Sequence, residues 1–280
     1  MGKPCILQGL SVFLGERRMP ERREWKYLGQ TKENYQGSLM TVVKYNNSKD
    51  LFVEFNDPVR CNVHTRATRF NSGRVKNPYY PTIYGIGAIG QKYKICDKNG
   101  KFYKEYFLWS NMMKRCFSEV TKSKQPMYRD VTCCEEWKIY ENFVDWIYSQ
   151  DNYDALKQTI NFALDKDIIE KGNKIYSPDK CSLVTQRINN LLIKSDSKRG
   201  ECPIGVFYDW RRKGYIAQCN DIENGHQYLG KYATEIEAFN AYKNYKEALI
   251  KRVAENEYDK GLITYRCYKA LMDYKVEITD

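Results

Sequence analysis

Residues 203–247 carry the pattern that most constrains how this chain can fold. Three short segments of alternating apolar and polar residues are followed directly by one amphipathic segment. Alternation is typical of a half-buried strand, and apolar residues three and four positions apart are typical of a helix. We therefore predict a three-stranded sheet packed on one helix, with Val206, Ile216 and Leu229 facing the helix.

The helix that follows these strands has a clear start in the sequence. Thr234 stands at the N-cap position and Glu237 at the third helical position, a combination that forms a capping box. Apolar residues continue at helical spacing toward Ala254. We expect one helix over residues 234–254 and a last helix over residues 262–274.

Charge and aromatic content indicate the kind of partner. Lys and Arg outnumber Asp and Glu by 46 to 35, which gives a formal net charge of +11, and aromatic residues make up 14% of the chain. Positive side chains pair with phosphates and aromatic rings stack on bases, so we expect a nucleic-acid partner. No apolar run is long enough to span a membrane, and the first residues lack the cleavage site of a signal peptide.

The expected fold class is α+β with three domains. Residues 1–90 combine a basic N-terminus with strand-forming runs and Gly/Pro turns, a pattern typical of a small β-barrel-like domain. Residues 91–200 hold two aromatic-rich helices and then a strand, a turn at Gly172-Asn173, a return strand through KIYSP and a helix. Residues 201–280 contain the three-stranded sheet and the last two helices.

The C-terminal segment resembles the Apetala-two/ERF DNA-binding domain. The resemblance rests on Gly205-Val206, Tyr215-Ile216-Ala217, Tyr228-Leu229-Gly230-Lys231-Tyr232, Thr234 and Glu237 to Tyr242. It implies that the exposed face of the sheet reads the major groove of double-stranded DNA. The base-reading candidates carried over are Tyr208, Trp210, Arg212, Tyr215, Gln218, Asn220 and Gln227. The phosphate-pairing candidates are Arg211, Arg212, Lys213 and Lys231, and Arg212 fits either role.

The central segment resembles phage and prophage proteins classed with HNH homing endonucleases. The matching residues are Trp109, Met112 to Cys116, VTCCEEW at 131–137, Phe143, LDKD at 164–167, Gly172-Asn173, YSP at 176–178, Cys181 and Ile188-Asn189. The NPYYPTIYGIGAIG segment at 77–90 is also similar to these proteins. The resemblance implies a ββα element that holds one divalent metal ion.

The chain departs from this nuclease scheme at its general base. An HNH site needs a histidine to activate water, and the sequence has none between His64 and His226. The residues left for catalysis are Asp165, Asp167, Asn173 and Asn189, with Asp165 and Asp167 as ligands for Mg²⁺ or Mn²⁺. We therefore expect a degenerate, nuclease-like central domain that lacks ordinary HNH catalysis.

The cysteines raise the question of a zinc site. Cys116, Cys133 or Cys134, and Cys181 lie in one expected domain, but no CxxC pair gives them the spacing of a zinc site. Buried free thiols are the favoured interpretation.

These observations predict a double-stranded DNA-binding protein of a phage or mobile element, acting in the cytoplasm of a bacterial host. Binding itself requires no cofactor. One alternative is a metal-dependent homing-type DNA endonuclease, which would use Mg²⁺ or Mn²⁺. Another is a phage protein that binds and blocks a host protein.

Overall fold

The computed structural model describes residues 26–159, 161–193 and 202–280. The chain divides into two compact units, one that ends at Tyr80 and one from Pro81 to Asp280. Both combine small sheets with helices, so the α+β class expected from the sequence is observed. The expected boundary near residue 90 lies ten residues after the division, and none separates the central and C-terminal regions.

The first unit is an antiparallel meander. Its strands are β1 (Thr31–Glu33), β2 (Leu39–Asn47), β3 (Asp50–Phe55) and β4 (Cys61–Thr65), followed by helix α1 (Ala67–Asn71). The tight turn between β2 and β3 falls in the NNSKD segment, where the sequence predicts a hairpin. Met40, Val42, Leu51, Val53 and Phe55 point into its core, where Phe70 of α1 joins them.

The first unit is an open sheet and not a barrel. The order β1-β2-β3-β4 has no β1–β4 pair to close it among residues 26–80. Two asparagines secure the chain that crosses its end instead. Asn34 donates to the Val75 carbonyl at 2.8 Å, and Asn77 donates to the Asp57 carbonyl at 2.9 Å. These two hydrogen bonds attach the segment around residues 75–77 to the loops of the sheet.

The central part of the second unit is mostly helical. Its elements are α2 (Lys104–Phe117), α3 (Glu119–Lys124), the 3-10 turn η2 (Pro126–Tyr128), β5 (Thr132–Cys133), the 3-10 turn η3 (Glu136–Lys138), α4 (Tyr140–Tyr148) and α5 (Tyr153–Lys157). The aromatic residues that the sequence places on helix faces form its core. Trp109 is fully buried and donates its indole N–H to the Trp137 carbonyl at 2.7 Å. Gly87 packs so closely on α2 that a Cβ there would lie 2.7 Å from the Met113 side chain.

Three strands and a helix follow, with a pairing that differs from the predicted one. The elements are β6 (Phe162–Asp165), β7 (Ile175–Tyr176), β8 (Ser182–Thr185) and α6 (Gln186–Leu191). The KIYSP segment was expected to return along the first strand, yet β7 pairs in parallel with β5, and β8 is the antiparallel partner of β6. All four residues of β8 are buried, whereas Ile175 of β7 is exposed, so the longer and fully buried strand lies beside β6.

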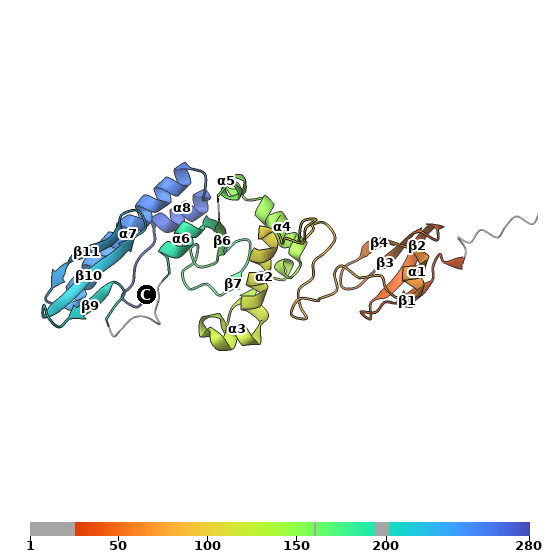
Figure 1. The fold of residues 1–280 in the computed structure, drawn as a ribbon, viewed down its shortest axis with the longest axis horizontal. Coiled ribbons are helices and arrows are strands. Elements are labelled where there is room, and N and C mark those ends of the chain that lie inside the picture. Colours follow the sequence, from red (N-terminus) through yellow and green to blue (C-terminus); the bar gives the residue numbers. More distant parts are fainter. Residues whose placement is uncertain (1–25, 160, 194–201) are drawn as a thin grey trace, which may run out of the picture. The chain divides into compact units, whose positions relative to one another are not determined.

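The C-terminal part has the expected three strands and helix. Strands β9 (Val206–Asp209), β10 (Gly214–Asp221) and β11 (Gly225–Tyr232) form an antiparallel sheet in the order β11-β10-β9, which we call the C-terminal sheet. Figure 1 shows α7 (Glu235–Asp259) running along this sheet, with α8 (Tyr265–Met272) against α7. The predicted capping box is confirmed by reciprocal hydrogen bonds between Thr234 and Glu237.

Contacts between the sheet and α7 explain why the two stay together. Gly205 precedes β9 with a φ of +78°, and a Cβ there would lie 2.0 Å from the Tyr242 ring of α7. Only glycine allows the chain to turn and approach the helix so closely. Val206, Ala217 and Cys219 of the sheet then bury against α7.

Among the described residues, no helix combines the length and the apolar character that crossing a membrane requires. Of the candidate zinc-ligand cysteines, Cys116, Cys133 and Cys181 are buried and Cys134 is half-buried, and all four are free thiols.

Candidate nucleic-acid interface

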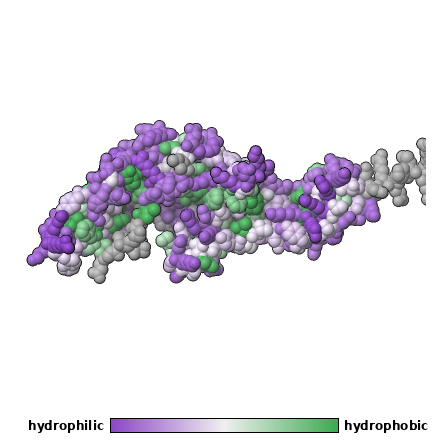
Figure 2. Space-filling model, viewed as in Figure 1, coloured by the Kyte–Doolittle hydropathy of each residue, from purple (hydrophilic) through white to green (hydrophobic). Residues whose placement is uncertain are grey.

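The turn between β9 and β10 presents a basic, aromatic tip. Asp209 accepts hydrogen bonds from the backbone N–H groups of Arg211 and Arg212 at 2.9 and 3.0 Å, which folds the turn back on itself. Lys213 completes it in the left-handed region, with a φ of 46°. We call residues 209–213 the hairpin tip. Its three cationic side chains are exposed, and Figure 2 shows a hydrophilic surface at the left end of the C-terminal sheet.

Trp210 is the most exposed large apolar residue of the described chain. It is 82% exposed, and its ring stands edge-on to Tyr208 at 4.5 Å. An exposed indole costs free energy in water unless a partner covers it. The hydrogen bond from the Arg212 amide, together with that from Arg211, lowers the pKa of Asp209, so its charge persists to low pH and keeps the tip folded.

The strand register defines which side chains share the exposed face of the C-terminal sheet. Phe207 and Lys231 lie opposite Ile216, Tyr228 lies opposite Gln218, and His226 lies opposite Asn220. Residues directly opposite each other in an antiparallel ladder point to the same side. We call this set the open face; its members are Phe207, Ile216, Gln218, Asn220, His226, Tyr228 and Lys231.

The open face offers both hydrogen-bonding groups and aromatic surface. Phe207, Ile216 and Tyr228 lie outside the apolar cluster that packs on α7, and Tyr228 is 56% exposed. Gln218 and His226 hold each other at 2.9 Å, and Asn220 is exposed beside them. A ligand that approaches this face meets amide, imidazole and phenol groups together.

Three of the base-reading candidates lie on the other side of the sheet. Tyr208 and Tyr215 are register partners whose rings meet at 5.0 Å, and Tyr215 packs against the cluster on α7. Gln227 lies opposite buried Cys219 and donates to the carbonyl of Asn224 at 2.9 Å. These side chains support the sheet from the helix side.

Ile216 is the reverse case. It was expected to face the helix with Val206 and Leu229, and those two do pack toward α7. Ile216 alternates with Tyr215 and Ala217, so it lies on the open face. It is nevertheless only 2% exposed, flanked in register by Phe207 and Lys231. Long neighbouring side chains, and not the helix, keep it from water.

Of the remaining candidates, Gln218, Asn220 and Lys231 lie on the open face, whereas Trp210, Arg211, Arg212 and Lys213 lie at the hairpin tip. Sequence reasoning missed Phe207, His226 and Tyr228. Tyr228 gave no simple signal, because Leu229 is an extra residue in β11 between the pairs Ala217–Gly230 and Gln218–Tyr228. A bulge of this kind shifts the alternation by one residue and is hard to detect in a sequence.

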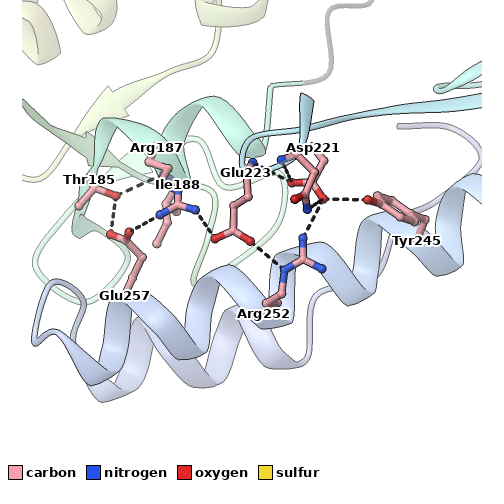
Figure 3. Close-up of polar contacts among 9 residues, drawn as sticks. Thr185, Arg187, Ile188, Asp221, Glu223, Tyr245, Arg252 and Glu257 are labelled. Carbon is pink, nitrogen blue, oxygen red and sulfur yellow. Dashed lines mark hydrogen bonds and ion pairs between the residues drawn. The ribbon is translucent and has the colours of Figure 1, made fainter. Parts of the chain in front are cut away.

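A charged network fixes the other end of the C-terminal sheet (Figure 3). Asp221 is 2% exposed and accepts from Tyr245 Oη at 2.7 Å and from Arg252 Nη2 at 2.7 Å. Arg252 also donates to Glu223 at 2.9 Å. The turn after β10 is thereby tied to α7 by two side chains.

Hydrogen bonding also decides the charge of Asp221. Burial alone would raise the pKa of Asp221, but hydrogen bonds from the Glu223 amide, the Tyr245 hydroxyl and Asn224 outweigh it. The pKa is therefore held well below its usual range. The carboxylate stays ionised throughout the neutral range, as an ion-paired acceptor must.

The same network reaches the central region through α6. Arg187 donates to Glu223 and lies 3.6 Å from buried Glu257 of α7. Thr185, the N-cap of α6, donates to Glu257 at 2.8 Å. Side chains of α6 and α7 therefore hold the turn after β10 in one position (Figure 3).

The residues proposed for nuclease chemistry are engaged within their own loop. Asp165 accepts from the backbone N–H groups of Asp167 and Ile168, both at 2.8 Å. Asp167 pairs with Lys166, whose ammonium also donates to the Asn173 carbonyl at 2.6 Å. The Asn173 amide donates to the Lys166 carbonyl at 2.9 Å. Desolvation raises the pKa of Asp165.

Asn189 lies on α6, half-buried. Within residues 26–159, 161–193 and 202–280, no group of three or more His, Cys, Asp or Glu side chains is arranged to hold a metal ion. Of the histidines, His64 pairs with Asp50 in the first unit and His226 belongs to the open face. The hydrogen bonds of Asp165 and Asn173 give the loop around them the geometry of a structural turn.

Comparisons with family models, with curated proteins and with solved structures found no match to this chain.

Proposed function

We propose that this protein binds double-stranded DNA through the open face of its C-terminal sheet, as a phage or mobile-element protein in the cytoplasm of a bacterial host. The observation that carries the proposal is the pairing of that face with the basic hairpin tip. Uncovered amides and aromatic rings lie beside three exposed cations and an exposed tryptophan. This is the combination that reads base edges and holds phosphates.

The dimensions of the sheet suit the major groove. That groove admits a two-stranded β-ribbon, and β10 and β11 form such a ribbon of eight residues each. Gln218 and Asn220 project from it, and amide side chains bond bidentately to adenine. Each such pair is worth about 1–3 kcal/mol of discrimination against the wrong base.

The hairpin tip supplies the phosphate contacts in this arrangement. Arg211, Arg212 and Lys213 follow one another at the end of the ribbon, and Lys231 lies on the open face itself. The resemblance of residues 203–247 to Apetala-two/ERF domains supports the same assignment, since those domains use the exposed sheet face. In this proposal the central region and the basic N-terminus add contacts to phosphates.

The test is selection from a random duplex library with the full chain, followed by affinity measurements at several salt concentrations. The proposal expects an enriched sequence and a log affinity that falls with log salt by about one slope unit per phosphate contact. Failure to bind any duplex at low salt overturns the proposal and favours the alternative of a host-protein partner.

Arg212→Ala and Arg266→Ala form a matched pair for this test. Both arginines are exposed, but Arg266 lies on α8, which packs on α7 and not on the sheet. If Arg212 contacts a phosphate, Arg212→Ala should lower the salt slope by about one unit. If Arg212 contacts a base, the variant should lose sequence preference at one position. Arg266→Ala should leave both unchanged. Equal effects of the two variants would contradict a specific role for the tip.

Cleavage is the alternative that the same samples test. Supercoiled plasmid incubated with the chain and Mg²⁺ or Mn²⁺ should stay intact, because Asp165 and Asp167 are engaged by backbone amides and by Lys166. Metal-dependent nicking that Asp167→Ala abolishes would instead favour a homing-type endonuclease.

A further inference from the structure

A cavity of about 640 Å³ lies in the central region, away from the C-terminal sheet. It is formed by the segment 92–94, the start of α2, both ends of α4 and the start of α5. Five tyrosines, three lysines and two carboxylates are the main lining groups. The volume falls within the range of small-ligand sites, roughly 300–1,000 Å³.

The floor of the cavity carries a carboxylate. Glu105 is only 8% exposed, and Tyr153 donates its hydroxyl proton to Glu105 Oε1. Burial, and then the bond to Glu105, raise the pKa of Tyr153, so the phenol keeps its proton and Glu105 is the acceptor. In the described chain Glu105 has no other hydrogen-bond partner, and its second oxygen is left to accept from a ligand.

The walls are aromatic. The rings of Tyr148 and Tyr153 lie 5.1 Å apart, and Tyr93 meets Tyr148 edge-on at 5.4 Å. Tyr140, nearly fully buried, closes the inner side. Phenol rings so arranged present flat apolar surface on which a planar heterocycle can stack.

The rim is cationic. Lys92 pairs with Asp145 at 2.5 Å, and Lys157 pairs with Asp154 at 3.2 Å while lying over the Tyr153 ring. Lys94 is exposed and forms no ion pair in the described residues. The cavity therefore offers positive charge at its mouth and negative charge at its floor.

We propose that this cavity binds a single nucleotide, with its base stacked among the tyrosines, its donor edge on Glu105 and its phosphate at the lysines. Guanine fits the floor better than thymine because its adjacent N1–H and N2–H groups can both donate to the second oxygen of Glu105. Thymine presents mainly acceptors on the corresponding edge, which a carboxylate repels. The site is separate from the open face and goes beyond the proposed duplex binding.

Other simple occupants fit less well. A bare anion would satisfy the lysines but would leave the floor carboxylate and the aromatic walls without a partner. An organic cation would suit Glu105 and the rings but would be repelled at the entrance by the ammonium of Lys94, which is unpaired within the described residues. Only a molecule with a planar donor edge and a distant negative group matches both ends.

The experiment is calorimetric titration of the full chain with dGMP, dTMP and inorganic phosphate. We expect dGMP to bind about tenfold more tightly than dTMP, the factor that a hydrogen bond to a charged group contributes. Single-stranded oligonucleotides of dG and of dT distinguish a free nucleotide from one within a strand. Binding of the dG oligonucleotide assigns the site to a strand, and binding of dGMP alone assigns it to free nucleotide; either result supports the proposal.

Two variants and one control connect binding to the cavity. Glu105→Gln should abolish the preference for dGMP over dTMP, while Lys94→Ala, at an exposed rim position, should weaken both nucleotides without disturbing the fold. Lys98→Ala, at an exposed lysine outside the cavity, should change neither. Circular dichroism verifies that Glu105→Gln remains folded. If this variant is unfolded, the comparison of Lys94→Ala with Lys98→Ala tests the proposal.

The proposal is overturned if dGMP does not bind, if phosphate competes as well as dGMP does, or if Lys94→Ala and Lys98→Ala behave alike. Its failure is distinguishable from failure of duplex binding. Arg212→Ala should alter duplex binding and leave dGMP binding unchanged, because the hairpin tip forms no part of this cavity.

Discussion

The C-terminal sheet and the loop at residues 165–173 hold similar polar side chains but use them in opposite ways. In the loop, backbone amides and one buried lysine occupy Asp165, Asp167 and Asn173. On the open face, Asn220 is exposed, and Gln218 is bonded only to another side chain of that face. Residue type therefore indicates a candidate site, but the surrounding backbone decides which polar groups are available to a ligand.

The largest expected effect concerns the network that holds the sheet in place. Asp221→Ala removes the acceptor of Arg252, Tyr245 and two backbone amides, so it should lower the free energy of unfolding by about 3 kcal/mol. Urea unfolding followed by tryptophan fluorescence measures this. A decrease in the free energy of unfolding of less than about 0.5 kcal/mol would mean that the network contributes no more to stability than an ordinary surface contact.

The same residue gives a pH dependence. Because the folded-state pKa of Asp221 is lowered, its contribution is complete above roughly pH 5 and is lost as the pH falls from there toward the folded-state pKa. The stability difference between the native chain and Asp221→Asn should therefore shrink between pH 5 and about pH 3. A difference that grows on acidification would contradict the assigned charge state.

The next effect tests the loop side of the comparison. Asp165→Ala leaves two backbone amides without their acceptor, so unfolding should become easier by about 1–3 kcal/mol. Duplex affinity of the folded variant should remain that of the native chain. If Asp165→Ala kept native stability but lost DNA binding or cleavage, Asp165 would act in binding or catalysis and not in holding the loop together.

Gln218→Ala tests the sheet side. The side chain is half-exposed and bonded only to His226, so stability should change by no more than about 0.5 kcal/mol. Sequence preference should weaken by about 1–3 kcal/mol at one base pair, measured by competition between the selected duplex and single-base variants. If Gln218→Ala weakened binding to all duplexes equally, Gln218 would contact the DNA phosphate backbone and not a base.

The smallest expected effect, that of Gln227→Ala, tests which face of the sheet contacts the bases. Gln227 lies on the helix side of β11 and donates to a turn carbonyl, so Gln227→Ala should leave sequence preference unchanged. Gln218→Ala in the neighbouring strand is its matched partner. If Gln227→Ala alone relaxed preference, the assignment of the two faces would be reversed.

Local patterns predicted much of this architecture. The strand pair around NNSKD, the helix of the Trp109 segment and the capping box at Thr234 all follow from nearby residues. Pairings between distant segments did not follow. KIYSP was assigned to the strand opposite β6, but burial placed Ser182–Thr185 there and paired Ile175–Tyr176 with β5.

Only part of the candidate site could be predicted, because some of its features depend on how distant strands pair. Consecutive residues of one turn are enough to identify Arg211, Arg212 and Lys213 as an exposed basic tip. Assigning faces needs the register, and the extra residue Leu229 shifts the alternation in β11, so Tyr228 was missed. The tyrosine-lined cavity gave no local signal, because Lys94, Glu105 and Tyr153 come from separate elements.

The sequence by itself determined the three strands and the capped start of the helix after them, since alternation, helical spacing and capping act over a few residues. It placed the end of that helix at residue 254, and the structure continues it to Asp259. Tertiary structure alone decided which side of those strands stays open. Gly205 allows close approach to Tyr242, the apolar cluster covers one face, and the ion pairs of Asp221 fix the far turn. Burial and charge pairing depend on residues far apart in the chain, so the availability of Gln218 and Asn220 is a property of the folded protein.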